Sequence, residues 1–392
     1  MLIWHWPLLI RESDMSNSTT SQQAGQGRPS LTQRQIIWRR FKRHRLGVIG
    51  TVIVLLLSLI AVFADFLSPY TYDSEHRTLA YAPPTPVHFF DENGASFRPF
   101  IYAYKQTRDP ISNRVTFSEE TDTKYYLTFF AKGDPYKLLG LFETDVHFFG
   151  VQTPSDSKAQ LFLFGSDTFG RDLLSRILFG ARVSMAIGPV SIVFSLFLGA
   201  LFGGLSGFYG GWIDMIIQRI IEILQSFPAL PLFLALSATL PSHWSSTAVF
   251  FGIVLIFSLI GWTGLARVLR GQILSLRESE YVLAAKAMGT KNLRIIFKHL
   301  LPNTLTTVIV TATLGIPGAI MGESALSFLG LGIRDPMTSW GLLLFDFLSS
   351  MMTNLRFHPW LMIPGVFIIV AVLAYNFMGD ALRDAADPFS NN

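Results

Sequence analysis

The sequence predicts an all-α polytopic membrane protein with six membrane-spanning helices and one small β-rich insertion. Half of its 392 residues are hydrophobic and only 15% are charged, and the mean hydropathy is +0.40. This balance is unusual for a soluble protein. The apolar residues also gather in separate runs, several of which have the length that a helix needs to cross a bilayer.

The composition excludes several kinds of site. The chain has no cysteines, so disulfide frameworks and cysteine-based zinc or iron–sulfur centres are ruled out. It contains no GxxxxGK[ST] motif, so we expect no ATP bound through a P-loop of its own. His76, His88 and His147 lack the spacing of metal ligands. We therefore expect no catalytic residue, no metal and no cofactor bound by this chain.

Residues 1–45 are predicted to form a basic tail in the cytoplasm. Its end carries five basic residues directly before the first apolar run: Arg39, Arg40, Lys42, Arg43 and Arg45. A nucleic-acid-binding arm is one alternative, but such a cluster next to a membrane helix is typical of a positive-inside anchor. We therefore expect lipid, and no nucleic acid, as its neighbour. Both Met1 and Met15 are open as the true starting residue.

The first predicted span covers residues 46–67 and takes the chain outside. Residues 68–165 mix charges, short alternating aromatic runs and turn signals, which predicts a small β-rich extracytoplasmic insertion. Asp91 to Gly94 has the composition of a hairpin turn, and strands are expected over residues 124–132, 138–143 and 146–151. No nucleophile, base and orienting group occur together there, so an enzymatic role is disfavoured.

Residues 166–182 are predicted to form an amphipathic helix on the outer membrane surface. Apolar residues from Leu173 to Ala181 fall on one helical face, and the polar residues turn away. Interfacial anchoring needs fewer assumptions than a catalytic acid–base pair. The outer interfacial motif consists of Asp167, Gly170, Arg171, Asp172, Ser175 and Arg176.

Five further spans are expected within residues 183–380, at about 183–208, 214–240, 248–265, 302–322 and 360–378, followed by a cytoplasmic tail over 381–392. A charge at mid-bilayer costs about 2.5–3.5 kcal/mol. Arg219 and Glu222 should therefore face the bundle or the inner interface and partly neutralise each other. Pro228 predicts a bend. We expect Glu323 to cap a helix end within reach of water. Pathway roles for these four residues are the alternative to helix packing.

A polar, basic loop over residues 266–302 separates the fourth and fifth spans and is predicted to lie in the cytoplasm. A helix near Glu280 to Met288 should end at Gly289, because glycine takes a left-handed cap without a Cβ clash. A short amphipathic helix over 291–300 then leads to Pro302. The helix could dock in a groove of another protein through its small residues. An ordinary loop whose charges set topology is the alternative.

This loop resembles the "EAA" loop of bacterial ABC-importer permeases. Ala284-Ala285, Gly289 and His299 to Pro302 keep the spacing of that pattern, with Leu283 in place of its Glu and His299 in place of a frequent Ile. The resemblance implies that this helix is held by an ATPase subunit, with Ala284 and Ala285 allowing close approach. The implied coupling residues are Glu280, Leu283, Ala284, Ala285, Gly289, His299, Leu301 and Pro302.

Three more segments resemble the dipeptide and oligopeptide branch of these permeases. They are Gly165 to Arg176, Glu323 to Gly332 and Gly379 to Pro388. The resemblance implies the type I importer permease fold in the bacterial inner membrane, with both termini in the cytoplasm. It also implies four kinds of relationship: a homologous second permease, two cytoplasmic ATPase subunits that bind ATP and Mg, an extracytoplasmic peptide-binding protein, and the lipid bilayer.

The function implied by the resemblance is therefore that of a peptide-importer subunit, not an enzyme. Nickel, glutathione or a peptide antibiotic are alternative cargoes within the same class. Outside that class, the alternatives are a membrane-anchored receptor or enzyme acting through residues 68–165 and a stand-alone channel or ion-coupled carrier. The sequence does not specify the cargo or the identity of the second permease.

Overall fold

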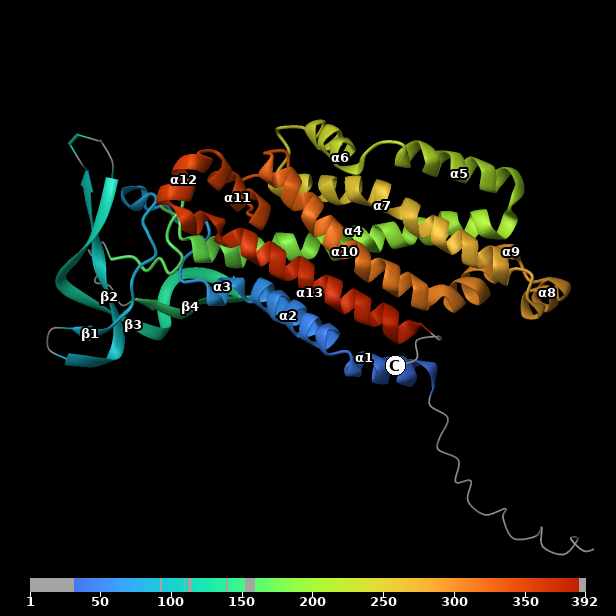
Figure 1. Cartoon of the computed structure of the whole chain (residues 1–392), viewed down its shortest axis with the longest axis horizontal. Helices are drawn as coiled ribbons and strands as arrows, with labels where there is room; N and C mark the ends of the chain where they lie inside the picture. Colours follow the sequence, from blue (N-terminus) through green and yellow to red (C-terminus); the bar gives the residue numbers. More distant parts are fainter. Residues whose placement is uncertain are drawn as a thin grey trace, which may run out of the picture.

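The structure is a computed structural model that describes residues 32–91, 94–108, 110–111, 115–138, 140–151 and 159–387. The choice between Met1 and Met15 and the end of the C-terminal tail, from Pro388, lie outside these residues. The described chain forms an elongated helical bundle with a small sheet at one end (Figure 1). Helices α1 and α8 and the end of α13 lie at the opposite end of the bundle.

Long helices build the bundle, and shorter ones connect them. Their bounds are α1 Gln33–Arg43, α2 Arg45–Val62, α3 Ala64–Leu67, α4 Leu173–Tyr209, α5 Gly211–Gln225, α6 Ala229–Ala238, α7 Ser246–Leu276, α8 Glu280–Ala287, α9 Asn292–Arg294, α10 Leu305–Phe328, α11 Trp340–Leu348, α12 Met351–Phe357 and α13 Ile363–Ala386. Within the described residues, five helical runs are long and apolar enough to cross a membrane, and the bent pair α5 and α6 can supply a sixth span.

The third span is broken in the middle. Helices α5 and α6 meet at an angle of 85°, so the prediction of one bent helix over residues 214–240 was incomplete. Pro228 immediately precedes α6, with φ −59°. A proline has no backbone N–H to donate and its ring clashes with the preceding turn, which explains why the chain changes direction here.

Helix α4 corrects the prediction of a separate surface helix over residues 166–182. It begins at Leu173 and continues without a break to Tyr209, so the amphipathic segment and the second span are one helix. Asp172 caps it by accepting the backbone N–H of Ser175 at 2.7 Å. A side-chain oxygen at this position satisfies a donor that the first helical turn leaves free.

The helices on both sides of the predicted coupling loop are longer than expected. Helix α7 runs to Leu276, past the predicted end of its span at residue 265. Asn292–Phe328 forms one helical run of 37 residues, which contains a π-helical turn over Ile295–Leu300 and a 3-10 turn over Leu301–Thr304. The expected fifth span therefore does not begin at Pro302. This proline lies in the first turn of the 3-10 segment, where a missing N–H is tolerated.

Glycines let α4 and α7 approach closely. A Cβ at Gly203 would lie 2.6 Å from the Ala266 carbonyl oxygen, and one at Gly207 would lie 2.9 Å from the Arg270 carbonyl oxygen. Small residues at such contacts are typical of membrane helices, whose association depends on close packing. The close packing of α4 against α7 therefore requires glycine at both positions.

The insertion is β-rich, as predicted, and contains an antiparallel meander in the order β1-β2-β3-β4. The strands are β1 His88–Asp91, β2 Gly94–Arg108, β3 Val115–Leu138 and β4 Phe142–Val151. The first half of β3 pairs with β2 and the second half pairs with β4. The predicted strand over 138–143 was wrong, because Gly140, with φ +73°, lies in the turn between β3 and β4.

Candidate functional site

The predicted coupling helix stands at the end of the bundle and is anchored by one side. Val282 and Ala285 are its buried residues. They join an apolar cluster that includes Phe208 of α4, Ile273 of α7 and residues of the π-helical turn. This side therefore connects α8 directly to α4, α7 and the run that continues into α10.

The other side of α8 is open. Leu283 is 53% exposed and Met288 is 79% exposed, and Ala284 is exposed as well. Ala285, in contrast, is only 4% exposed. Since Ala285 lies three residues after the buried Val282, both occupy the same helical face. The expectation that both alanines face a partner therefore fails for Ala285, which faces its own chain.

Gly289 ends α8 as the sequence predicted. The residue has φ +77°, and the backbone N–H groups of Gly289 and Thr290 donate to the carbonyls of Lys286 and Ala285 at 2.9 and 3.0 Å. This pair of bonds is a Schellman motif. A Cβ at this position would meet nothing within 4 Å. The backbone conformation, and not a lack of space, requires glycine here.

Of the remaining coupling residues, Glu280 is the first residue of α8, and the other three lie on the π-helical and 3-10 turns. Glu280 and Pro302 are exposed, whereas His299 and Leu301 are half-buried. The Asn303 side-chain amide donates to the Tyr281 hydroxyl at 3.1 Å and to the His299 carbonyl at 3.0 Å. These bonds join α8 to the run that leads into α10. π-helical turns are rare and occur frequently at functional sites.

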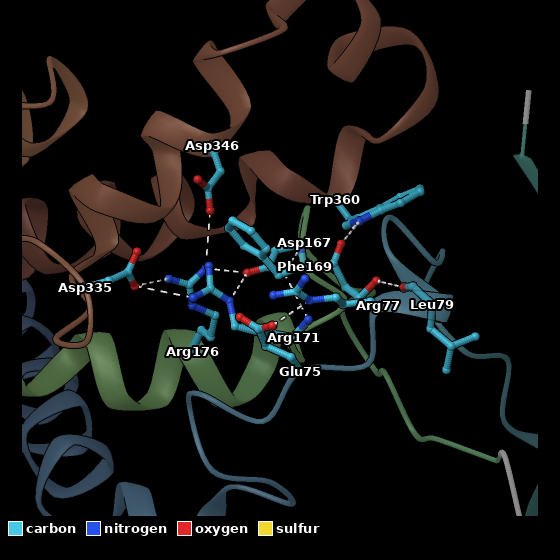
Figure 2. A network of polar contacts seen from close by, with 11 residues as sticks. Glu75, Arg77, Leu79, Asp167, Phe169, Arg171, Arg176, Asp335, Asp346 and Trp360 are labelled. Atoms are coloured by element: carbon cyan, nitrogen blue, oxygen red, sulfur yellow. Dashed lines mark hydrogen bonds and ion pairs between the residues drawn. The ribbon is translucent and has the colours of Figure 1, made fainter.

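At the sheet end of the bundle, the outer motif forms a buried charge network (Figure 2). Asp167 lies at its centre. One carboxylate oxygen accepts the backbone N–H groups of Phe169 and Arg171 at 2.8 and 3.0 Å. The other accepts Arg171 Nε at 2.7 Å and also bonds an Arg176 guanidinium nitrogen. One side chain thus holds both arginines and the turn before α4.

Two acidic residues from distant segments complete the network. Asp335 Oδ1 lies 3.4 Å from guanidinium nitrogens of both Arg171 and Arg176, and Asp346 of α11 lies 3.3 Å from Arg176. The side chain of Arg176 is only 2% exposed. The prediction of a surface helix whose polar residues turn away from the membrane was therefore wrong for Arg176, which is buried among acidic side chains. A buried arginine requires a counter-charge, but the sequence did not indicate which acids supply it.

Asp172 and Ser175 form a second polar group beside this network. One oxygen of Asp172 accepts the Ser175 backbone N–H at 2.7 Å and the Ser175 hydroxyl at 2.6 Å. Burial raises the pKa of Asp172 from its ordinary 3.8 to about 7, although the bonds from Ser175 oppose the rise. Gly170 has φ +76°, and a Cβ there would fall 1.9 Å from the His76 carbonyl oxygen. No other residue fits that position without displacing the backbone.

Glu323 lies inside α10 and is completely buried, with 0% exposure. Its carboxylate accepts the Ser327 hydroxyl at 2.7 Å, and the Ser327 oxygen accepts the Ile333 backbone N–H at 3.0 Å. The expectation that Glu323 caps a helix end within reach of water was wrong, because α10 continues to Phe328. Its contacts instead connect α10 to the segment that follows it.

Helix α5 takes part in two charged pairs. Arg219 and Glu222 are ion-paired at 2.8 Å, with side chains 74% and 52% exposed. They neutralise each other as expected but do not face the bundle of this chain. The sequence analysis missed a second pair, in which Asp214 accepts two bonds from Arg270 of α7 at 2.5 and 2.6 Å. Bidentate arginine–carboxylate pairs are geometrically specific, so this contact fixes α5 against α7.

A cavity of about 410 Å³ lies beside the break between α5 and α6. Helices α4, α6, α7 and α10 all contribute to it, mostly through small side chains. Its lining includes Ser191, Ser195, Ala229, Gly261, Gly264 and Thr311. Pro228 directly precedes Ala229, so the break forms one border. Among the described residues, no three His, Asp or Glu side chains lie together so as to hold a metal ion.

Comparison with known proteins adds an independent observation. Residues 174–391 match the family model described as "Binding-protein-dependent transport system inner membrane component". The matched region includes α4, α8 and the broken third span. The chain belongs to this family. Residues 32–84 of this inner membrane component also match the "N-terminal TM domain of oligopeptide transport permease C".

Relatives of this inner membrane component carry peptide-transport names. It is 33% identical over 362 residues to the dipeptide transport system permease protein DppC of Bacillus subtilis, covering 92% of this chain and 87% of that protein. It is 31% identical over 350 residues to OppC of the same organism, covering 89% and 87%. It is 46% identical over 229 residues to OppC of Haemophilus influenzae, covering 57% and 70%.

The similarity to a solved structure is weaker. A chain of the MetNI methionine ABC transporter in inward-facing conformations has a TM-score of 0.40 and 16% identity, covering 53% of this chain and 96% of that one. At this level the similarity carries no argument about function. The assignment rests on the family match and on the relatives above.

Proposed function

We propose that this chain is the membrane-spanning permease subunit of an ATP-driven importer for dipeptides or oligopeptides. The names of its relatives support this cargo class. The chain forms part of the translocation path and hydrolyses nothing itself. ATP and Mg belong to two cytoplasmic ATPase subunits. A homologous second permease and an extracytoplasmic peptide-binding protein complete the importer.

The proposed orientation places α8, α1 and the C-terminal end of α13 in the cytoplasm of the bacterial cell. The support is the charge of α1, which contains Arg39, Arg40, Lys42 and Arg43 and lies at the same end of the bundle as α8 (Figure 1). Basic residues next to a span favour the cytoplasmic side. The β-rich insertion then lies outside the cell membrane.

The two-sided character of α8 is the observation that carries the proposal. Its open side presents Leu283 and Met288 to a partner, and its buried side anchors Val282 and Ala285 in the bundle. A short helix of this kind suits a groove on an ATPase subunit. Movement of that groove on ATP binding would pass through the anchored side to α4, α7 and α10, as in other rigid-body transitions.

The substrate path is proposed to run past the cavity beside Pro228. Support comes from the small residues in its lining, such as Ser195, Gly264 and Thr311, which lie among larger apolar side chains. The break also frees backbone carbonyls of the kind that line cavities in membrane proteins. Arg219 and Glu222 lie on α5, on one side of that break. Glu323 contributes to packing in this conformation, because it is fully buried.

Cross-linking from neighbouring alanines tests the coupling role. The chain has no native cysteine, so Ala284→Cys and Ala285→Cys each provide one reactive position in the assembled importer. We expect Ala284→Cys, on the open side, to cross-link to a co-purified ATPase subunit, and Ala285→Cys to react much less. Equal cross-linking, or none from either position, contradicts the proposed docking side.

Uptake measurements test the function itself. Cells that depend on this importer should take up labelled di- and oligopeptides, and removal of the ATPase subunits should abolish the uptake. Uptake that persists without ATPases identifies a stand-alone carrier. Transport of nickel or glutathione with no competition by peptides identifies another cargo within the same class. Neither result depends on the side of α8 that docks.

A further inference from the structure

The turn between β3 and β4 carries an exposed apolar tip. Leu141 is 76% exposed and Phe142 is 68% exposed, and Phe142 lies opposite Leu138 in the hairpin. The next pair along the strands is Lys137 with Glu143, whose charged atoms lie 3.2 Å apart. The hairpin therefore ends in hydrocarbon side chains, with a mutually neutralised ion pair directly behind them.

This tip lies beside the spanning helices. Lys137 and Gly140 line one side of a cleft of about 740 Å³, and Ser58 and Val62 of α2 and Ala186 of α4 line it from the bundle. Both α2 and α4 are candidate membrane spans. Since a helix rises 1.5 Å per residue, Ser58 lies about 6 Å along the axis before Val62. The hairpin tip thus stands opposite the last turns of α2.

An apolar surface connects α2 to the hairpin. Phe66 of α3 packs against Phe130 and Phe148, with ring centroids 6.2 and 5.8 Å apart. Phe130 is 65% exposed and Leu59 of α2 is 52% exposed. Phe130 also has φ +55°, a backbone conformation that is uncommon for a bulky residue. Its ring is therefore held outward next to the end of the span.

We propose that the β3–β4 hairpin dips into the membrane leaflet beside α2 and places Leu141 and Phe142 among the lipids. The argument is continuity, because the exposed surface of a spanning helix faces lipid and this surface extends through α3 onto the hairpin. Exposed apolar patches mark membrane or protein contacts, and here the adjoining surface is a membrane span. The contact holds the insertion at a fixed height above the bilayer.

The backbone limits how deep the tip goes. A two-stranded hairpin keeps N–H and C=O groups on its outer edges, and the hydrocarbon core does not tolerate such groups without partners. The tip therefore rests at the level of the headgroups and upper acyl chains, as interfacial segments do. Lys137 and Glu143, with side chains 65% and 78% exposed, remain within reach of water at that depth.

Site-specific quenching tests the proposal in the full chain, purified with its partner subunits and reconstituted into phospholipid vesicles. Because the chain has no cysteine, an environment-sensitive fluorophore can be attached to Leu141→Cys, Phe142→Cys or Phe97→Cys alone. Phe97 is the matched control, since it is a phenylalanine of the same insertion and is 104% exposed. It lies on β2, in the part of the strand that runs beside β1 and not beside β4.

Two quenchers distinguish the outcomes. Phospholipid with a spin label on the upper acyl chain should quench both tip positions severalfold more strongly than position 97, and aqueous iodide should do the reverse. Equal responses at all three positions mean that water surrounds the tip, and they overturn the proposal. Protection of the tip from both quenchers means that a partner protein covers it, which also overturns the proposal. All three substitutions are at exposed positions, so folding is not at stake.

Discussion

Asp167 and Arg176 form an ion pair in which both side chains are almost entirely withdrawn from solvent, at 1% and 2% exposure. The arginine belongs to the first turns of α4 and the aspartate to the turn before it. Figure 2 shows that Asp335 and Asp346 approach the same guanidinium from the other side. The pair thus joins three segments at the sheet end of the bundle.

Asp167→Asn should destabilise the protein strongly. Removal of one partner leaves a buried charge poorly compensated, which typically costs about 3–5 kcal/mol. Glu75→Gln is the control, because Glu75 pairs with Arg77 at 3.0 Å near the same network but with side chains 36% and 78% exposed. Such surface pairs contribute about 0–1 kcal/mol. Thermal unfolding in detergent measures both, and similar melting temperatures for the two variants would contradict a structural role for the network.

Asp172→Asn should remove the part of the pH dependence of folding stability that comes from this carboxyl group. Because burial raises the pKa of Asp172 to about 7, the folded protein keeps a proton that the unfolded chain releases near pH 4. The stability from this proton is fully present below pH 4 and is lost as the pH rises through about 7. The contribution of this proton to the free energy of unfolding is on the order of a few kcal/mol.

The asparagine variant imitates the protonated carboxyl at every pH. We therefore expect wild-type and variant melting temperatures to agree near pH 4 and the variant to be the more stable one above pH 7. Because both proteins share all other titrating groups, their difference isolates this residue. A difference that is constant across pH 4–8 would show that Asp172 does not titrate in this range.

Two substitutions at Gly289 should separate the effect of backbone strain on peptide uptake from the effect of side-chain size. Alanine there adopts a left-handed conformation at a cost of about 1–2 kcal/mol, and its Cβ would meet nothing within 4 Å. We expect Gly289→Ala to reduce peptide uptake partly and Gly289→Trp to abolish it, with both variants at normal levels in the membrane. Both variants place an L-residue in the same left-handed conformation, so equal uptake by the two would argue against a partner surface beside the turn.

Filling the cavity should block transport without harming the fold. Gly264 of α7 lines the cavity and Gly271 of the same helix does not, and a Cβ at either glycine would meet nothing within 4 Å. We expect Gly264→Leu to lower peptide uptake substantially and Gly271→Leu to leave it nearly unchanged, with equal amounts of both proteins in the membrane. If both variants transport at the wild-type rate, the path does not pass this cavity.

Among the described residues, five of the six predicted spans are helical runs long and apolar enough to cross a membrane, and the bent pair α5 and α6 can supply the sixth. An apolar run of sufficient length has few other stable environments. The sequence predicted helix ends poorly. Helix α7 ends at Leu276 and not at residue 265, and the run into α10 begins at Asn292 and not at Pro302, because a helix can continue past the apolar stretch that marks a span in the sequence. Gly289 is the exception, since its left-handed conformation is a local requirement that glycine alone meets easily.

The sequence also predicted the candidate sites unequally, and the difference again depends on whether the signal is local. The sequence predicted the helix that ends at Gly289 because its signals are local, although the opposite orientations of Ala284 and Ala285 depend on the packing around Val282. The charge network was misjudged because its acids at Asp335 and Asp346 lie far along the chain from Arg176. Periodicity showed that the polar residues share a helical side, but not which segment covers that side.

The helical run Asn292–Phe328 has a mechanical consequence. At about 1.5 Å per residue, its 37 residues form a helical run about 55 Å long. One end of this run contacts α8, and Glu323 makes its hydrogen bonds near the other end. The Asn303 side chain of this run donates to the Tyr281 hydroxyl of α8 at 3.1 Å, so a hydrogen bond and one continuous helical run connect α8 to the surroundings of Glu323. The wider π-helical turn at Ile295–Leu300 is the place where this helical run can bend.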